Sequence, residues 1–356
     1  IPVLNSKGVC VNIFLYKDIS NLTNGRKKIF ILGLGYVGLT LGLILAESKF
    51  DVFGYDNNKT IRNLLKKKKK TFYENGLQDY LDKYINNNFK ILDTPKYKAD
   101  VHIISVGTPL KNNSKKPNLQ HLTKAVQVVC NNLKKNDLII LRSTVPIGTC
   151  RELVIPLVES LTNLRFGKDI NISFCPERTV EGLALKELKI LPQLIGSFDK
   201  KSFDLSFDIF NKYTSVVNID KIESAEIAKL IDNSFRDVIF GYSNQIALIS
   251  EKYELNLNSI ISKINSGYNR NFVPFPSPGV GGPCLTKDPY LLNYSFRKNK
   301  LKASISIQAR KVNNEMVKNI FQTCHKFLKK HNKNKFNAKI FISGIAFKGE
   351  PETSDV

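Results

Sequence analysis

RKKIFILGLGYVGLTLGLILAESKFDVFGYD, residues 26–56, holds four elements in one run. A short apolar strand over 29–32 comes first, and a glycine turn and an apolar segment of helical length follow it. A second strand, DVFGYD, closes the run. Strand, turn, helix and strand in this order and of these lengths predict a βαβ unit, and hence an α/β fold.

The glycines of this unit, Gly33, Gly35 and Gly38, form a GxGxxG pattern directly after the first strand. The first glycine permits the tight turn, the second lets the backbone approach a pyrophosphate, and the third lets helix and strand pack closely. The phosphate then rests on the helix N-terminus. Asp56 ends the second strand, where a carboxylate bonds a ribose 2′-hydroxyl and disfavours a 2′-phosphate. The unit therefore predicts NAD as the cofactor, since a glycine-rich turn alone does not explain why these features coincide.

Further strands are expected over 100–109, 137–149 and 170–182. Each is a near-continuous apolar run, as in buried parallel strands, and each ends in small or polar residues. Ligands of a doubly wound sheet lie beyond the carboxyl ends of its strands, so these ends should border one crevice. Any single Thr or Glu there is also consistent with a turn or a helix cap. The residues expected to bind the cofactor are Gly33, Gly35, Tyr36, Val37, Gly38, Asp56, Gly107, Thr108, Pro109, Ser143 and Thr144.

From Asp220 the pattern changes to apolar residues at three- and four-residue spacing over some thirty residues. This periodicity predicts one long helix, which suits a connector or a dimer interface. Lys229 and Asn233 are four apart and project from the same face of it. Taken alone, they are typical of a solvated stripe.

Cys284 lies in PSPGVGGPCLTKDPYLL, residues 276–292. A lone cysteine is usually a small buried hydrophobe. Here GVGGP permits close backbone approach, and Lys287 and Asp288 follow one helical turn later. A helix beginning near Pro283 would place the thiol at its electropositive end and lower the thiol pKa. A packing role and a nucleophilic role both stay open.

The bulk composition sets the class of the protein. A chain of 356 residues that is 42% hydrophobic has room for two or three domains. It has no apolar run approaching the ~20 residues that span a bilayer, and no secretory leader opens it, so a cytoplasmic protein without membrane insertion is expected. The six cysteines lack CxxC or CxH spacing, which predicts free thiols and no metal site.

The formal net charge of +23 raises the question of a polyanionic partner. The excess is spread along the chain, and its densest cluster, Lys66–Lys70, follows IRNLL and fits a solvated helix end. We therefore expect no dedicated nucleic-acid partner. A positive field also attracts phosphorylated substrates.

Seven motifs occur in collinear order between Arg26 and Val356: GLGYVGL, VGTP, RSTVPIGT, CPERTVEG, AKLIDNSFRD, GVGGPCLTKDPYLL and GIAFKGEPETSDV. In this order the chain resembles the nucleotide-sugar 6-dehydrogenases, which oxidise UDP-glucose, UDP-N-acetylhexosamines or GDP-mannose to uronates. The resemblance implies two Rossmann-like domains joined by a long central helix, with NAD in the first and the uridine diphosphate in the second. It also implies a homodimer built on that helix.

AKIFISGIAFKGEPETSDV, residues 338–356, resembles the first strand and turn of the second domain, and the sequence stops before the rest of the family pattern. The expected fold is an α/β chain with an N-terminal Rossmann-like NAD domain, a central long helix and a truncated Rossmann-like UDP-binding domain. The expected divisions are an unassigned extension over 1–26, the NAD-binding domain over 27–218, a central helical dimerisation domain with the cysteine over 219–325, and the start of the UDP-binding domain over 326–356.

The resemblance also implies a chemistry. Oxidation of a primary alcohol to a carboxylate passes through a reactive aldehyde, which a cysteine holds as a thiohemiacetal and then as a thioester until water releases the acid. By resemblance the catalytic residues are Cys284 as nucleophile, Lys229 and Asn233 as oxyanion-stabilising groups, Asp288 as the partner of Lys229 in proton transfer, Glu177 as base for thioester hydrolysis, and Thr144 and Glu181 beside the water and the nicotinamide.

SGYNRNFVPFPSPG matches the family loop that closes over the sugar. Within it Arg270 fits a phosphate fork, and a surface arginine fits equally well. By resemblance the substrate-binding residues are Glu177, Arg178, Lys229, Tyr268, Asn269, Arg270, Gly281 and Lys287.

The sequence leaves the substrate open. Arg178, in CPER, together with DPYLL resembles the N-acetylhexosamine branch, which favours UDP-N-acetylmannosamine or UDP-N-acetylglucosamine. The Lys287–Asp288 pair resembles UDP-glucose enzymes. Three alternatives remain: a two-electron dehydrogenase with no use for Cys284, a truncated copy without activity, and a polyanion-binding protein.

Overall fold

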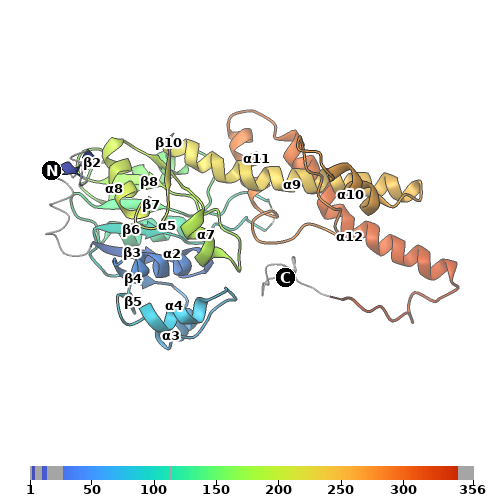
Figure 1. The fold of residues 1–356 in the computed structure, drawn as a ribbon, viewed down its shortest axis with the longest axis horizontal. Helices are drawn as coiled ribbons and strands as arrows, with labels where there is room; N and C mark the ends of the chain where they lie inside the picture. Colours follow the sequence, from blue (N-terminus) through green and yellow to red (C-terminus); the bar gives the residue numbers. More distant parts are fainter. Residues whose placement is uncertain (1, 5–9, 14–26, 113, 344–356) are drawn as a thin grey trace.

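The computed structural model describes residues 2–4, 10–13, 27–112 and 114–343. Figure 1 shows an eight-stranded sheet at one end and a set of long helices that extends away from it. A separate pair of short antiparallel strands, β1 (Pro2–Leu4) and β2 (Cys10–Ile13), lies in the extension that the sequence left unassigned.

The large sheet has the strand arrangement of a dinucleotide-binding domain. From β3 its order runs through β4 to β5 on one side and through β6 and β7 to β8 on the other, with β9 and β10 beyond. All neighbours pair in parallel except β8 and β9. The order reverses between β3 and β6, where doubly wound sheets bind their ligands. The strands are β3 (Lys28–Leu32), β4 (Asp51–Tyr55), β5 (Phe89–Ile91), β6 (Val101–Ile104), β7 (Leu138–Leu141), β8 (Asn171–Phe174), β9 (Gln193–Ser197) and β10 (Val216–Lys221).

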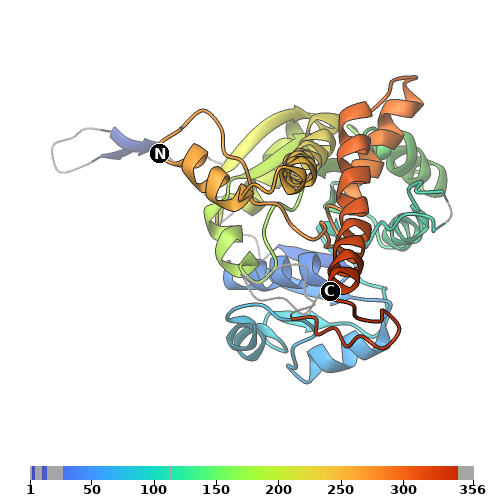
Figure 2. The ribbon, with the colours of Figure 1, turned by 90° about the vertical axis from the view of Figure 1, so that its right-hand side faces the viewer.

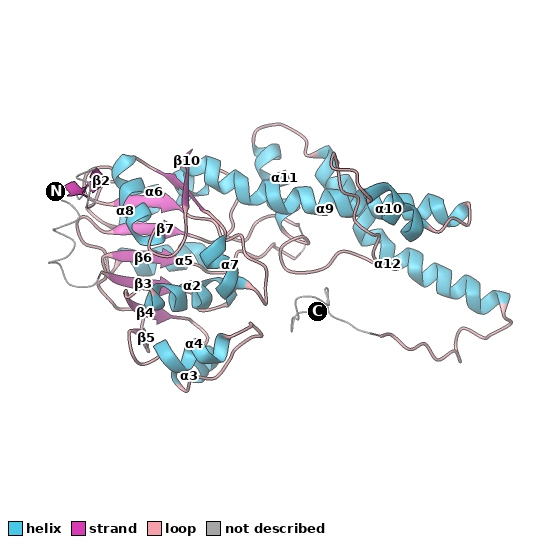
Figure 3. Ribbon diagram, viewed as in Figure 1, coloured by secondary structure: helices cyan, strands magenta, loops and turns pink. Residues whose placement is uncertain are grey.

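Helices cover both faces of this sheet, which explains the continuous apolar strands (Figure 3). Ile29 and Ile31 of β3 pack into one core, and Phe30 and Leu32 pack into the other. The strands expected over 100–109, 137–149 and 170–182 are confirmed, each shorter than its apolar run because the final residues form loops at the carboxyl edge. The covering helices are α2 (Tyr36–Glu47), α3 (Lys59–Lys66), α4 (Leu77–Tyr84), α5 (Gln120–Cys130), the π-helical turn η1 (Cys150–Val154), α6 (Ile155–Leu161), α7 (Ala184–Ile190) and α8 (Lys200–Phe210).

The expected long helix is confirmed as α9 (Ile222–Lys252), which has 31 residues and follows β10 directly. It leaves the sheet and packs along α12, and Figure 2 looks along α9 with α12 beside it. A Cβ added at Gly241 of α9 would lie 2.8 Å from the Cβ of Ala309, so the glycine lets these two helices approach closely. The remaining helices of the extension are α10 (Leu257–Asn265), α11 (Asp288–Lys298) and α12 (Ser304–Lys330).

Two expected domain boundaries fall inside regular elements. The boundary after residue 218 lies within β10, and the boundary after residue 325 lies within α12. Residues 338–343, expected as the first strand of a second domain, form no strand. A strand needs a hydrogen-bonded neighbour, and no described strand pairs with this segment. The rest of that motif, 344–356, lies outside the described residues.

Within the ranges that the structure covers, no helix has both the length and the apolarity to cross a bilayer.

Candidate active site

The glycine turn after β3 has the conformation that the sequence predicted. Gly33 adopts a left-handed φ of +92°, which an L side chain rarely adopts, and its N–H donates to the Tyr55 carbonyl at 2.9 Å. A Cβ at Gly38 would lie 1.9 Å from the Gly33 carbonyl oxygen, so only glycine fits there. A Cβ at Gly35, by contrast, would meet no atom within 4 Å. Open space therefore lies where a pyrophosphate would approach the turn.

This turn and its surroundings fit a bound dinucleotide. Gly35 caps α2 without a side-chain hydrogen bond, so the N–H groups at Tyr36 and Val37 begin a helix with no competing cap. Asp56 follows β4, and its two carboxylate oxygens accept the N–H groups of Leu34 and Asn58, each at 2.8 Å. Each oxygen keeps a lone pair for a ribose hydroxyl. The structure thus holds the carboxylate in place beside the turn.

The loops after β6 and β7 are tied to each other at the carboxyl edge. Ser143 Oγ donates to the Val106 carbonyl at 2.6 Å, and Thr108 Oγ1 donates to the Thr144 carbonyl. Gly107 and Pro109 lie exposed beside these bonds. The expectation that these strand ends border one region is confirmed for β6 and β7.

The loop after β8 reaches Tyr36 and α9. Glu177 is buried and accepts the Thr179 N–H. Burial raises the pKa of the Tyr36 hydroxyl strongly, Thr179 opposes this, and the carboxylates of Glu74, Glu177 and Glu181 raise it further. This loop and the glycine turn are therefore close neighbours.

Arg178, in the same loop, turns toward α9. Its Nε donates to Asp232 Oδ2 at 3.1 Å, and the Arg178 side chain stays partly exposed. The ion pair ties the loop after β8 to α9 one residue before Asn233.

Lys229 and Asn233 are buried, so the solvated stripe that the sequence favoured for them taken alone is wrong. Their helix face is covered by α11 and by the segment before it. Asn233 Nδ2 donates to Asp288 Oδ2 at 2.6 Å, and Lys287 Nζ lies 2.6 Å from the other oxygen of Asp288. The Asp288 carboxylate is itself buried and is thus held between two donors.

Cys284 lies outside a helix, contrary to the expectation of a helix beginning near Pro283. Cys284 is in a turn, and its carbonyl accepts the N–H groups of Lys287 and Asp288. The helix that follows, α11, begins only at Asp288, with Pro289 in its first turn. The thiol therefore lacks the electropositive helix end that was expected to lower its pKa.

The pKa of the Cys284 thiol is raised instead. Although the residue is exposed, the protein around it desolvates the thiol, and this is the largest cause. The charge of Asp288 raises the pKa further, Lys229 and Lys287 oppose it, and Glu177 adds a smaller rise. These mutual effects place the predicted nucleophile, lysines and carboxylates at one site.

The site closes against the carboxyl edge of the sheet. Ile147, from the loop after β7, donates its N–H to Ser295 Oγ of α11 at 3.0 Å. Leu110 and Ile147 also pack against a small core formed by Leu230, Leu291 and Leu292. Because α11 follows Cys284 directly, this packing fixes the cysteine segment beside the cofactor loops.

The predicted substrate loop lies apart from this group. Tyr268, Asn269 and Arg270 are exposed in the segment after α10, and the Arg270 guanidinium lies 6.0 Å from the Tyr268 ring centre. Across the described residues, no hydrogen bond or ion pair ties them to Cys284. Gly281 is exposed in the cysteine segment, and Lys287 pairs with Asp288.

Comparison with known families agrees with this geometry. The model of the UDP-glucose/GDP-mannose dehydrogenase family, NAD binding domain, matches residues 27–214, and that of the central domain matches residues 223–315. The chain belongs to this family. It is an NAD-dependent dehydrogenase, and the NAD cofactor predicted from GxGxxG and Asp56 is confirmed.

Three relatives show how far the likeness extends. The UDP-N-acetyl-D-mannosamine dehydrogenase of Campylobacter jejuni is 32% identical over 340 residues, covering 94% of this chain and 81% of the relative. The solved UDP-D-ManNAc dehydrogenase of Pyrococcus horikoshii is 31% identical with a TM-score of 0.81, covering 86% of this chain and 72% of that one. A UDP-glucose dehydrogenase from Pyrobaculum islandicum, 23% identical with a TM-score of 0.78 over 86% of this chain and 72% of that one, shares the fold.

Glu226 is a buried residue of this dehydrogenase that the sequence prediction missed. Its two oxygens accept the N–H groups of Gly148 and Cys150 at 2.5 and 2.9 Å, so α9 holds the loop that carries Thr144. Burial raises the pKa of Glu226 to about 7 despite these bonds. A signal was present, because Glu226 lies three residues before Lys229 on the same helix face.

Asp237 and Arg310 were also missed. Asp237 lies four residues after Asn233, and Arg310 Nη1 of α12 donates to Asp237 Oδ1 at 2.7 Å in the protein interior. The helical spacing pointed to Asp237, but nothing local marks Arg310, which lies 73 residues further along the chain.

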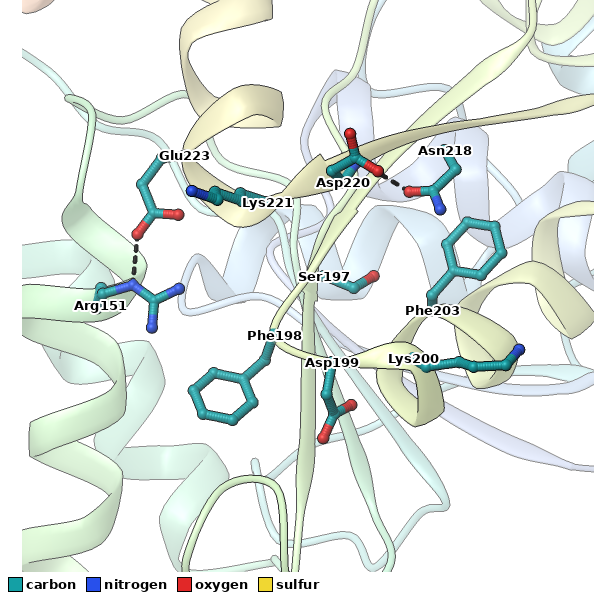
Figure 4. Close-up of a pocket in the computed structure, with 10 residues that line it drawn as sticks. All are labelled: Arg151, Ser197, Phe198, Asp199, Lys200, Phe203, Asn218, Asp220, Lys221 and Glu223. Atoms are coloured by element: carbon teal, nitrogen blue, oxygen red, sulfur yellow. Dashed lines mark hydrogen bonds and ion pairs between the residues drawn. The ribbon is translucent and has the colours of Figure 1, made fainter.

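A cavity of about 940 Å³ lies away from this site (Figure 4). It borders β9, β10, α8 and the start of α9, and none of the predicted site residues lines it. Figure 4 shows Glu223 paired with Arg151, and the Asn218 side chain accepting the Asp220 N–H. We therefore separate this cavity from the candidate active site. No group of three or more His, Cys, Asp or Glu side chains in the described ranges could hold a metal ion.

Proposed function

We propose that this dehydrogenase oxidises the C6 alcohol of a UDP-N-acetylhexosamine to a uronate through a covalent bond to Cys284. One observation carries the proposal. The thiol lies among Lys229, Asn233 and Asp288, at the carboxyl edge of a sheet built to hold NAD. A two-electron dehydrogenase needs no thiol at that place.

The glycine turn and Asp56 hold the cofactor, with Thr108 and Ser143 ordering the adjoining loops. Bound NAD accepts the hydride removed in each of the two oxidations. The remaining tasks fall to side chains of this chain: orienting the sugar, moving protons and retaining the aldehyde.

Lys229 and Asn233 act on the oxygen at C6. The ammonium and the amide N–H stabilise negative charge that develops there, and their burial strengthens this effect. Asp288, oriented by Asn233 and Lys287, assists Lys229 in taking the alcohol proton.

Cys284 prevents loss of the aldehyde. Its sulfur adds to the aldehyde carbon, and the carbonyl oxygen becomes the thiohemiacetal oxygen beside Lys229. Loss of a second hydride gives the thioester. Glu177 then takes a proton from water, and the water oxygen bonds to the carbonyl carbon. The carbon–sulfur bond breaks, and the proton held by Glu177 passes to the sulfur and restores the thiol. Thr144 and Glu181 border the water in this proposal.

The relatives favour UDP-N-acetylmannosamine as the substrate, because several that are 32–33% identical over at least 90% of this chain carry that name. UDP-N-acetylglucosamine differs from it at one carbon and is the first alternative, and UDP-glucose is the second. Substrate holding is assigned to Glu177, Arg178, Lys229, Tyr268, Asn269, Arg270, Gly281 and Lys287.

The test is the yield of NADH per sugar. UDP-N-acetylmannosamine should give about two NADH per sugar and the corresponding uronate. UDP-N-acetylglucosamine and UDP-glucose should react slowly or not at all. Cys284→Ser should form no uronate, since its hydroxyl does not support the thioester.

Cys324→Ser is the matched control, because Cys324 is a partly exposed thiol remote in sequence from the site. It should keep the full yield. About one NADH per sugar, or uronate formation by Cys284→Ser at the normal rate, would refute the thioester route.

We also propose that two copies pair through α9. Ile231, Phe235, Tyr242, Ile249 and Tyr253 are all more than half exposed. Their spacings of four, seven, seven and four residues place them along one side of the helix. A contiguous exposed apolar face of this kind is typical of an interface.

The proposed division of the chain is an NAD-binding domain from residue 27, a central part that begins with α9, and a UDP-binding part after Lys330, where α12 ends. The cysteines whose side chains the structure describes are unpaired, which supports a reducing compartment and hence the cytoplasm.

A further inference from the structure

The segment that carries Cys284 is held by side chains of α9 and α12. Residues 276–287 contain no helix or strand, so other groups must fix their backbone. Ser277 N–H donates to Asn244 Oδ1 of α9 at 2.7 Å. One guanidinium of α12 supplies two further bonds to this segment.

Arg310 of α12 binds this segment on both sides of the thiol. Its Nη2 donates to the Val280 carbonyl at 2.9 Å, and its Nη1 donates to the Leu285 carbonyl at 3.2 Å. Val280 lies four residues before Cys284 and Leu285 lies one residue after it. One planar group therefore spans the backbone that bears the nucleophile.

The Arg310 guanidinium is itself fixed. It is 2% exposed, and its Nη1 also donates to Asp237 Oδ1 at 2.7 Å, on a residue that is fully buried. Asn313 donates to the same carboxylate oxygen at 2.8 Å and to the Asp237 carbonyl at 3.0 Å. A buried ion pair persists only with such supporting bonds, because removing either partner leaves an uncompensated charge.

Arg310 and Asp237 together form a clamp on the cysteine segment. Asp237 connects this clamp to the residues proposed to act on the substrate. It lies on the same face of α9 as Lys229 and Asn233, at successive spacings of four residues. One helix face thus presents the two oxyanion groups and, one turn later, anchors the arginine that holds the thiol segment.

We infer that Arg310, held by Asp237, is a positioning residue that keeps Cys284 in register with Lys229 and Asn233. The inference rests on the proposed function, because it assumes that the Cys284 thiol captures the aldehyde. A displaced thiol fails at that step while the first oxidation still proceeds.

The test uses Arg310→Lys, which keeps the buried charge but lacks the fork that reaches both carbonyls. The assay contains hydrazine, which condenses with free aldehyde to a hydrazone and releases water. Wild type should still give about two NADH per sugar, because Cys284 captures the aldehyde first. Arg310→Lys should fall toward about one NADH, with hydrazone accumulating.

In the absence of hydrazine, the same variant should lose about 10- to 100-fold in kcat. Its KM for the sugar should stay close to the wild-type value. A merely structural defect lowers the amount of working enzyme but leaves the NADH yield per sugar at about two. That result for Arg310→Lys would overturn the inference.

Arg297→Lys, at an exposed arginine of α11, is the matched control and should keep the wild-type yield and kcat. Asp237→Asn is the second variant. It tests the same inference if Arg310→Lys does not fold. It should also lower the yield, and a full yield would count against the clamp.

Failure of the proposed function gives a different pattern, namely no NADH from any of the three sugars with wild type. The alkylation rate of Cys284 by iodoacetamide then still tests the clamp. We expect it to change several-fold in Arg310→Lys, and an unchanged rate would overturn the inference.

Discussion

At the scale of single residues, the central fact is that Cys284 is a thiol with a raised pKa among charged neighbours. Desolvation and Asp288 disfavour the thiolate, whereas Lys229 and Lys287 favour it. A thiol of raised pKa is protonated over most of the physiological range, and alkylation requires the thiolate. Its reactivity should therefore rise only at alkaline pH.

The alkylation rate of Cys284 should reach its midpoint above the ordinary cysteine value of about 8.5. Asp288→Asn removes a negative charge that raises the thiol pKa and should lower this midpoint. The measurement is the rate of iodoacetamide labelling of the Cys284 peptide against pH, followed by mass spectrometry.

Asp232→Asn is the control for this experiment, because Asp232 is an exposed carboxylate of α9 that pairs with Arg178. Its midpoint should match the wild type. A wild-type midpoint below the ordinary value would show that the lysines outweigh both desolvation and Asp288.

At the scale of elements, α9 is the part that organises the site. Along one face Glu226 holds the loop after β7, Lys229 and Asn233 face the cysteine, and Asp237 anchors Arg310. A polar stripe on a buried helix face is costly unless each group finds a partner. The partners here come from three separate segments, so the helix joins them.

Glu226 gives this element a pH dependence. Its pKa rises from 4.5 to about 7 on folding, so between these values the folded state binds more protons than the unfolded state. Its contribution to the free energy of unfolding therefore falls as pH rises through that window, by about 3 kcal/mol in all. Glu226→Gln is neutral at every pH and should remove this fall, as measured by urea unfolding at pH 5, 6 and 7.

Glu223→Gln is the matched control, since Arg151 lowers the pKa of Glu223 and that group acts with the opposite sign. The decrease of stability with pH should persist in Glu223→Gln. Equal slopes for wild type and Glu226→Gln would show that the carboxyl is not the group that titrates.

The sequence predicted those elements whose signal is local. The glycines after β3, Asp56 and the thirty-residue period of α9 each lie within one continuous stretch, and the structure has them as expected. The helix start near Pro283 was wrong because two prolines, Pro283 and Pro289, both suit a first turn. In the structure the carbonyls of Val280 and Leu285 accept bonds from Arg310 of a distant helix, a contact that no local pattern indicates.

The burial of Lys229 and Asn233 could not be predicted from the neighbouring sequence either. Their spacing showed a shared helix face but not what covers it. Cover comes from α11 and the cysteine segment, which begin more than forty residues later. Polar residues on a helix are usually solvated, and only this long-range packing made them exceptions.

At the scale of the whole molecule, the exposed apolar face of α9 is the surface where we expect a second copy to bind. The face opposite the polar stripe carries Phe235 and Tyr242, which are 63% and 58% exposed. We expect the chain to have twice its single-chain mass in light scattering. Phe235→Glu with Tyr242→Glu should shift it to a monomer, because two charges would be buried at the centre of the interface.

Ile190→Glu serves as the control, since Ile190 is 61% exposed at the end of α7 and lies outside the α9 face. It should leave the mass unchanged. A wild-type chain that is monomeric at micromolar concentration would contradict the proposed pairing.

The reversal of direction between β8 and β9 determines where this protein tolerates insertions and deletions. Because β9 and β10 run against the other strands, α9 begins at the sheet edge opposite the glycine turn and crosses the domain before it reaches the chemistry. Its first turns have no loop in which a length change is absorbed. One inserted residue between Ile222 and Lys229 would rotate every later side chain by about 100°. The start of α9 should therefore tolerate substitution better than insertion or deletion, which the loops absorb.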